Sequence, residues 1–346
     1  MRGADSSLAC GAAKALCAVV ASPHAEMGAA LAGELDRTLS KLAACARCSD
    51  WRTRCYAARA LDKLAQTPHA DTGLAFAAAL PGVLPDFIGD LYGTCTWRQA
   101  DSARVLGAVA RSPHDAVGMV LASNVAQILD GLTVCLGSAQ AGVRTNAAAA
   151  LGDVASCPHD DVLEQVAGQA PAVLDSLVAC LRDAKQPVKL AATTAIQAIA
   201  SVQHAEIGAA LAAATPAALG GLLTRVPAED WKLRDGLYGA VGAIAKHPHT
   251  GVGAPLALVL PGVLNDLTRS VCVNSSSIQL VAAQHLLNIA RCQHDDACAV
   301  IADHADSILP QLRAALQHCS TTSAKPLIMD VLHSITQVQA AHSNTA

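Results

Sequence analysis

The sequence predicts an all-α fold, a right-handed α-solenoid of stacked repeats with a 45-residue period. The first observation is a histidine that returns every 45 residues without a slip, at His24, His69, His114, His159, His204, His249 and His294. A fixed period of this size is typical of stacked structural units. The second is composition: 52% of the 346 residues are hydrophobic but only 2% are aromatic. Ala, Leu, Val and Ile therefore dominate, and Ala and Leu favour helices.

The third observation is a pair of apolar positions, three residues apart, that return with the same period. One position reads Leu16, Leu61, Leu106, Leu151, Ile196, Val241 and Leu286, and the other reads Val19, Leu64, Val109, Val154, Ile199, Ile244 and Ile289. Apolar residues at this spacing share one face of a helix. We expect this segment to be the third helix of each unit, packed between its neighbours.

Two further helices are expected in each unit. The first begins at the Ser/Thr-Pro-His marker, where Ser22, Thr67 or Ser112 would cap the helix and proline would take its first position. The second opens with another recurrent proline, at Pro81, Pro171, Pro216 and Pro261. These three-helix units predict one solenoid over residues 1–337, with a half-repeat at 5–21 and repeats starting near 22, 67, 112, 157, 202, 247 and 292. Residues 338–346 are expected to be a tail.

The segment from Asn146 to Ile199 resembles the armadillo repeat and, less closely, the HEAT repeat. It joins an Ala-Ala-x-Ala-Leu helix, the marker turn and the run Ala170-Pro171-Ala172-Val173-Leu174. The resemblance implies a non-catalytic scaffold that binds other proteins, as part of a multiprotein complex. A third helix ending Ile-Ala before a polar-His turn is also similar to axonemal central-pair and radial-spoke repeats. That likeness implies a cytoplasmic protein of a ciliary axoneme, the cytoskeleton or another microtubule-associated assembly.

Import receptors of the armadillo type carry Trp and Asn four residues apart on successive third helices. Here the Trp position reads Lys14, Arg59, Arg104, Ala149, Thr194, Gly239 and Gln284, and the Asn position reads Ala18, Lys63, Ala108, Asp153, Ala198, Ala243 and Asn288. Neither ladder is present, which argues against a nuclear-import receptor. Instead, Lys14, Arg59, Lys63 and Arg104 predict a basic N-terminal half of the concave face, suited to an extended acidic segment. The alternative is a solvated helix face with scattered charges.

Each of the three tryptophans stands beside a basic residue at the start of a third helix, in the pairs Trp51-Arg52, Trp97-Arg98 and Trp231-Lys232. Tryptophan next to a basic residue is typical of an interface hot spot. The alternative is a cap that folds over the helix end and seals the junction between repeats. Together with the four basic residues above, these are the candidate partner-binding residues.

The recurrent histidines are expected to be structural. Equivalent residues of neighbouring repeats lie about 10 Å apart, too far to share a metal ion, so each imidazole is predicted to bond a carbonyl of the neighbouring turn. Cys45, Cys48 and Cys55 are predicted to be core residues. Zinc is the alternative, but a second cysteine pair at ligand spacing is missing. We expect no metal and no cofactor.

An enzyme subunit is the competing class, since phycobilin lyases and deoxyhypusine hydroxylase resemble HEAT solenoids. The sequence lacks the His-Glu dipeptides of the hydroxylase and has no Gly-x-Ser-x-Gly or HExxH motif. A soluble armadillo signalling adaptor is a second rival. The net charge of −4 and the pI near 6.3 argue against a nucleic-acid partner. No apolar run is expected to reach the roughly eighteen residues of a membrane span.

Overall fold

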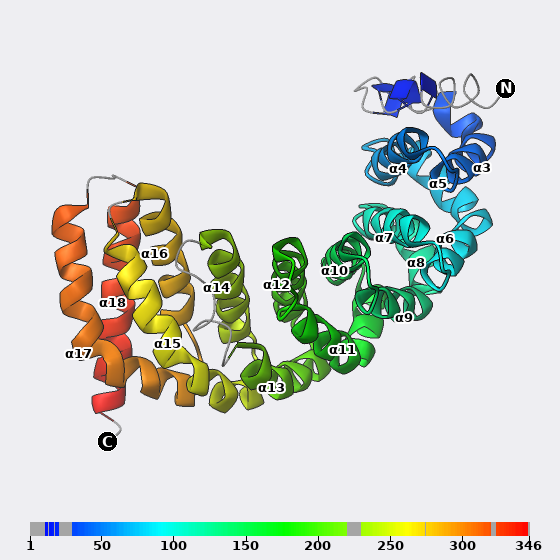
Figure 1. Ribbon diagram of the computed structural model, residues 1–346. Coiled ribbons are helices and arrows are strands. Elements are labelled where there is room, and N and C mark those ends of the chain that lie inside the picture. The colour runs from blue at the N-terminus through cyan, green and yellow to red at the C-terminus, as the bar shows by residue number, and fades with distance from the viewer. Residues whose placement is uncertain are drawn as a thin grey trace. The chain divides into compact units, whose positions relative to one another are not determined.

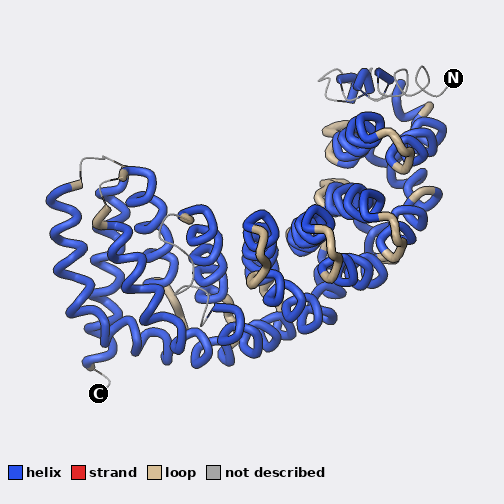
Figure 2. The backbone as a smooth tube through the Cα atoms, viewed as in Figure 1, coloured by secondary structure: helices blue, strands red, loops and turns tan. Residues whose placement is uncertain are grey.

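The structure is a computed structural model that describes residues 11–12, 14–16, 18–20, 30–219, 230–273, 275–319 and 323–344. Throughout these residues the regular elements are helices, without a strand (Figure 1; Figure 2). This confirms the predicted all-α class. The helices group into two compact units, Met1–Ser176 and Leu177–Ala346. The marker Ser22-Pro23-His24 and much of the expected half-repeat at 5–21 lie outside the described residues.

In the described part of the N-terminal unit, three third helices stack on one another. Its elements are α3 (Leu35–Ala46), α4 (Trp51–Ala65), α5 (Ala70–Ala79), the 3₁₀ turn η1 (Leu80–Gly82), α6 (Leu84–Leu91), α7 (Thr96–Ala110), α8 (Asp115–Ala122), α9 (Val125–Leu136), α10 (Ala141–Ala155) and most of α11 (Asp160–Cys180). The third helices are α4, α7 and α10, and each packs on the next. In the layer behind them, α6 packs on α9.

The C-terminal unit repeats this stacking with longer helices. Its elements are α12 (Gln186–Ser201), α13 (Ala205–Leu219), α14 (Trp231–Lys246), the 3₁₀ turn η2 (Thr250–Val252), α15 (Gly253–Val271), α16 (Ser276–Ala290), α17 (Asp295–His318) and α18 (Ala324–Ser343). The third helices α12, α14, α16 and α18 contact one another in that order (Figure 1). Helices α13, α15 and α17 form a second row in the same order.

The core consists of the two apolar positions predicted from the period. From the second repeat onward all of them are buried: Leu61, Leu106, Leu151, Ile196, Val241 and Leu286, with Leu64, Val109, Val154, Ile199, Ile244 and Ile289. At the N-terminal end of the stack, Leu16 and Val19 are only half-buried. Burying a side chain of this size stabilises the fold by roughly 1.5–3 kcal/mol, so these positions hold the helix rows together.

The predicted three-helix unit occurs in only part of the chain. In the repeats that start near 67 and 112, the first and second helices are separate and meet at bends of 54° and 70°. In the later repeats they merge into α11, α13, α15 and α17, each with a proline inside the helix. The expectation that a recurrent proline begins a second helix is wrong for these repeats.

A repeated pentapeptide shows what decides between the two forms. Leu-Pro-Gly-Val-Leu is followed by Pro85 in one repeat, where η1 and α6 form, and by Asn265 in another, where α15 continues through Pro261. One internal proline removes one backbone donor and kinks a helix. Pro81 and Pro85, four residues apart, remove two donors, and each disfavours helical backbone in the residue before it. The second proline therefore accounts for the break.

The break between α8 and α9 has a different origin, because proline is absent there. The Ser123 hydroxyl donates to the carbonyl of Met119 at 3.1 Å, and the Asn124 amide donates to the carbonyl of Val120 at 2.9 Å. These side chains compete with the backbone donors that would continue the helix. The competition ends α8 at this point.

Two of the recurrent histidines form the bond that the sequence predicted. His114 Nε2 donates to the carbonyl of Thr67 at 2.8 Å, and His159 Nε2 donates to the carbonyl of Ser112 at 3.1 Å. Each imidazole thus reaches the marker of the preceding repeat. In the repeat near 247 a different residue, His247, makes the equivalent bond to the carbonyl of Val202 at 3.1 Å.

The helix caps at the markers differ from the prediction. His69, His114 and His294 are themselves the N-cap residues of α5, α8 and α17. The hydroxyls of Thr67 and Ser112 instead accept the N–H of the histidine two residues on. This serine–threonine turn satisfies the backbone before the helix begins, so the proline lies outside the helix rather than at its first position.

A recurrent glycine makes room for the imidazoles. A Cβ atom on Gly73 would lie 2.5 Å from the His114 ring, and one on Gly118 would lie 2.3 Å from the His159 ring. The position four residues after the histidine is glycine in most repeats, as Gly28, Gly73, Gly118, Gly208 and Gly253. The 45-residue recurrence of these glycines is the feature of the sequence that indicates the contact between each imidazole and the preceding repeat.

Two expectations about the chain's segments need correction. Thr250–Val271 is long and apolar enough to cross a membrane by length and composition, although Leu256, Leu260 and Leu264 are buried where α15 packs on α13, α16 and α17. The expected tail at 338–346 is helical as far as Ser343, because α18 continues past the predicted boundary. Gln339 in that stretch donates to Asp306 of α17 at 2.8 Å, which holds the end of the helix.

Candidate functional site

Helix α4 begins with a cap that leaves its first residue facing solvent. The Asp50 carboxylate accepts the Thr53 N–H at 2.9 Å and the Thr53 hydroxyl at 2.6 Å. These bonds lower the pKa of Asp50, first through the hydroxyl. Trp51 therefore starts α4 with 64% of its surface exposed, and the Arg52 guanidinium lies 5.5 Å from the centre of its ring.

Three exposed side chains follow one line along α4. Trp51, Arg59 and Lys63 are spaced at multiples of four residues, which places them on one side of the helix. We call these three residues the α4 stripe. Within the described part of the chain, neither Arg59 nor Lys63 forms an ion pair. The structure thus brings a tryptophan and two basic residues, predicted separately, onto one surface.

Other predicted basic residues already hold carboxylates. Arg104 lies 3.2 Å from Asp101, and Asp101 is also 2.9 Å from Arg54. Lys14 is exposed, on the short described stretch before residue 30. The expected basic half-face is therefore reduced to the α4 stripe and Lys14, because acidic residues at other repeat positions reach the same surface.

A chain of charges also joins the three third helices. Arg111 at the end of α7 bonds Asp62 of α4 at 2.9 Å and forms a second ion pair with Asp153 of α10. Desolvation raises the pKa of Asp153, and Arg111 opposes that shift. Gly107 leaves room for this carboxylate, since an added Cβ would lie 2.6 Å from it. The sequence offered little indication of these ion pairs, because the paired residues are 42 and 49 positions apart.

Trp97 lies between arginines at a junction between repeats. The guanidinium carbons of Arg54 and Arg98 are 4.0 and 5.1 Å from its ring centre. Arg98 in turn approaches Asp90, which Arg47 bonds at 2.9 Å. The half-buried Trp97 therefore has the surroundings of the sealing cap that was the alternative to a hot spot.

Trp231 heads a second polar cluster, in the C-terminal unit. Its ring centre is 6.2 Å from that of Tyr238, which is fully buried and donates its hydroxyl to Asp266. Arg234 pairs with the same carboxylate. Desolvation raises the pKa of Tyr238, and the bond to Asp266 adds to the shift. Trp231 thus packs on a buried network, while its neighbour Lys232 is exposed.

A histidine–aspartate pair adjoins this network. His285 Nε2 lies 2.7 Å from Asp235, and the opposite ring nitrogen is buried without a hydrogen bond. Within the described residues, His285 forms no hydrogen bond to a hydroxyl or thiol that it could activate as a nucleophile. Its ring lies 6.0 Å from Tyr238. The pair is accounted for by packing at the junction between α14 and α16.

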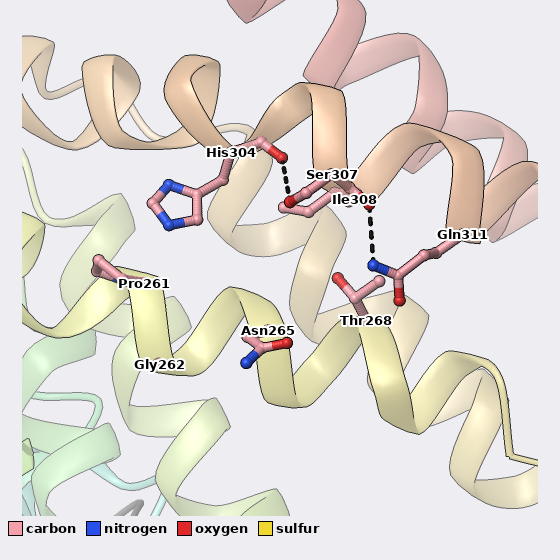
Figure 3. A pocket seen from close by; sticks show the side chains of 8 residues that line it. All are labelled: Pro261, Gly262, Asn265, Thr268, His304, Ser307, Ile308 and Gln311. Carbon is pink, nitrogen blue, oxygen red and sulfur yellow. Dashed lines mark hydrogen bonds between the residues drawn. The ribbon is translucent and has the colours of Figure 1, made fainter.

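A cavity of about 370 Å³ opens between α15 and α17 (Figure 3). Its polar lining residues include Asn265, Thr268, His304 and Gln311. Most of these are already used: Thr268 bonds a carbonyl of its own helix at 2.7 Å, and His304 and Gln311 do so at 2.9 Å. The cavity therefore offers few free polar groups to a ligand.

The cysteines of α3 and its following turn show no ligand cluster. Cys48 donates to the carbonyl of Asp50 at 3.4 Å, and burial raises the pKa of Cys45. Cys45, Cys48 and Cys55 are all half-buried rather than fully buried. Across the described residues, His, Cys, Asp and Glu form no group of three or more that could hold a metal ion.

Comparison with solved structures identifies the architecture. A designed armadillo repeat protein in complex with the peptide (KR)4 aligns with a TM-score of 0.59 at 21% identity, covering 73% of this chain and 99% of that one. A second designed armadillo repeat protein aligns with a TM-score of 0.55 at 20% identity and the same coverage. An engineered protein aligns at 0.50 and 19% identity over 97% of both chains.

No protein-family model matches the sequence, and no curated protein matches it either. At these identities the structural likeness establishes the fold alone. The predicted armadillo-type solenoid is confirmed as the architecture of this chain.

Proposed function

We propose that this protein is a non-catalytic scaffold that binds an extended acidic segment of a partner protein on the α4 stripe. The observation that carries the proposal is which basic residues of the third helices form ion pairs and which do not. Arg59 and Lys63 are exposed and unpaired within the described residues, whereas Arg104 and Arg111 hold carboxylates. Exposed Trp51 on the same line of α4 supplies an apolar anchor.

The charge of the ligand follows from the carboxylates of this face. Asp101 lies between two arginines, Arg54 and Arg104, and Asp62 and Asp153 share Arg111. A basic peptide would have to displace those arginines, while an acidic one meets free donors. The designed relative binds the basic peptide (KR)4, so we expect this chain to have the opposite preference.

The test is fluorescence anisotropy with labelled (DE)4 and (KR)4 peptides. The wild type is expected to bind (DE)4 more tightly, with affinity that falls between about 50 and 200 mM salt because exposed charges are screened. R59A/K63A should weaken (DE)4 binding about tenfold, since two charge-assisted contacts are lost. Adding R104A should change the affinity less than about threefold, because Asp101 already engages Arg104.

The matched control is R269A/R291A, which removes two exposed arginines from the C-terminal unit. It should bind (DE)4 like the wild type. All variants should keep the wild-type helical circular dichroism, since Arg59, Lys63, Arg269 and Arg291 are exposed and Arg104 is only half-buried. Equal binding of (DE)4 by R59A/K63A and by the control would refute the α4 stripe as the binding face.

The cellular setting is a separate proposal that rests on the sequence pattern of the third helix and marker turn. It assigns the scaffold to a cytoplasmic, microtubule-associated assembly such as a ciliary axoneme. Retention of the protein in detergent-extracted axonemes is the expected result, and complete release into the soluble fraction would favour a soluble adaptor instead. An absorption band from a bound chromophore or metal in purified protein would favour the enzyme class.

A further inference from the structure

Two cysteines lie close together at the junction between α16 and α17. Cys292 follows the end of α16 and is buried, with 7% of its surface exposed. Cys298 lies in the first turns of α17, and its thiol is 3.4 Å from the carbonyl of Cys292. Six residues of chain therefore bring the Cys298 thiol back against the backbone of Cys292.

Cys298 can be reached from solvent through a cavity. This cavity has a volume of about 590 Å³ and lies between the start of α17 and the end of α18. Its lining includes Cys298, the carboxylates of Asp295 and Asp296, and His342. A small polar molecule thus has a path to the Cys298 sulfur, while Cys292 lies behind it in the core.

The repeat pattern explains why a side chain fits at this position. Cys298 stands four residues after His294, where Gly73 and Gly118 stand in their own repeats. In those repeats the imidazole of the following marker fills the space over the glycine. Opposite Cys298 the cavity is lined by Val338 and Ala341 of α18. The space that an imidazole fills in the earlier repeats is therefore open here.

The local electrostatics make the two sulfurs unequal. The hydrogen bond from Cys292 lowers the pKa of Cys298 to about 7, although burial and Asp295 act in the opposite direction. The same hydrogen bond, together with burial, raises the pKa of Cys292. By contrast, the exposed Cys272 at the end of α15 has its pKa raised by burial. Thiolate is the reactive form of cysteine, so Cys298 is the nucleophile of the pair.

We propose that Cys292 and Cys298 form a thiol–disulfide pair that a hydroperoxide oxidises, with Cys298 as the attacking residue and Cys292 as the resolving one. The Cys298 thiolate attacks one oxygen of hydrogen peroxide, the O–O bond breaks, and one water leaves after protonation. The resulting sulfenic acid is attacked by the Cys292 sulfur, which forms the S–S bond and releases the second water. Two thiols and one peroxide become one disulfide and two waters.

Tryptic cleavage separates this pair from its control. Cleavage after Arg291 and Arg313 releases residues 292–313, which contain only these two cysteines, and cleavage after Arg269 releases residues 270–291, which contain only Cys272. After treatment of the folded protein with one equivalent of hydrogen peroxide, unreduced peptide 292–313 should lose the mass of two hydrogen atoms. Peptide 270–291 should retain a free thiol and an unchanged mass, and dithiothreitol should restore the mass of peptide 292–313.

Two variants assign the roles. C292S should stop at a sulfenic acid on Cys298 that dimedone traps, and C298S should leave Cys292 reduced. Circular dichroism checks that each variant is folded. On the wild type alone, iodoacetamide at pH 7 should modify Cys298 about tenfold faster than Cys272, because a larger fraction of Cys298 is thiolate. The proposal is overturned if peptide 292–313 keeps both thiols, if Cys272 reacts as fast, or if the disulfide joins two chains.

Discussion

The imidazole of His159 donates to the carbonyl of Ser112 at 3.1 Å and packs over Gly118 of the same preceding repeat. This contact between repeats combines one hydrogen bond, one half-buried imidazole ring and one glycine that leaves room for the ring. The 45-residue period predicted the hydrogen bond, because equivalent residues of successive repeats face equivalent neighbours, and the bond forms at His114 and His159. It did not predict that the histidine, rather than the preceding Ser or Thr, would stand at the N-cap position of the helix, since Ser and Thr are the commoner residues there.

The glycine of this contact provides a test at the scale of a single residue. G118A should destabilise the protein by about 1–3 kcal/mol, because the new methyl would overlap the His159 ring. G168A is the matched control in α11, where an added Cβ meets nothing within 4 Å. It should stabilise the protein by about 0.5–1 kcal/mol, as alanine does in an open helix position. Urea denaturation of both variants measures the difference, and destabilisation by both would contradict the packing role of the imidazole.

His247 makes a second residue-scale prediction, on pH. Its pKa is lowered by desolvation, with smaller repulsion from His249 and His294, and its Nε2 bonds Val202. The unfolded chain therefore takes up this proton first as pH falls below about 6.5. Stability should be lost as pH falls from about 7.5 to 5. In H247Q, where an amide can still donate to Val202, the pH dependence of the urea midpoint should be weaker; an unchanged pH dependence would exclude His247 as a source.

At the scale of elements, the third helices were the most predictable part of the chain. Their apolar positions repeat with one phase, and from Leu61 onward each is buried as expected. The first and second helices were less predictable, because one proline is compatible with both a break and a kinked continuous helix. The outcome depends on further residues such as Pro85, which breaks the helix together with Pro81, and Asn124, which has no counterpart at its position in the other repeats.

The charge chain of Asp62, Arg111 and Asp153 ties α4, α7 and α10 together, and its removal tests that link. R111A should destabilise the protein by about 1–3 kcal/mol near pH 7, because it leaves the desolvated Asp153 carboxylate without its partner. Asp153 already has a raised pKa, so the folded state accepts this proton more readily than the unfolded state does. The penalty should therefore shrink as pH falls from 7 toward 4.

The control for this variant is R291A, at the repeat position equivalent to Arg111. Arg291 is exposed and has no ion pair in the described residues, so its removal should change stability by less than about 0.5 kcal/mol. A comparable loss of stability in both variants would mean that Arg111 acts through its helix position rather than through the two carboxylates.

At the scale of the whole molecule, the period was sufficient to predict an armadillo-type stack, because repeated burial of one helix face permits few other arrangements. The binding surface was predicted only in part. Arg59, Lys63 and Trp51 are exposed on α4, but Arg104 is paired with Asp101. A single repeat position shows which charged residue each repeat carries there. It does not show which charged residues at other repeat positions, 42 to 49 residues away in the sequence, form ion pairs with it.

The central claim is that the unpaired cations of the α4 stripe determine the charge of the partner that binds. Reversing the charge at these two positions tests this claim most directly. R59E/K63E places two carboxylates where the two unpaired cations stand. By fluorescence anisotropy, this variant should bind (DE)4 at least about tenfold more weakly than the wild type and should bind (KR)4 more tightly, since like charges repel at these positions. Retention of the wild-type preference for (DE)4 in R59E/K63E would contradict the account.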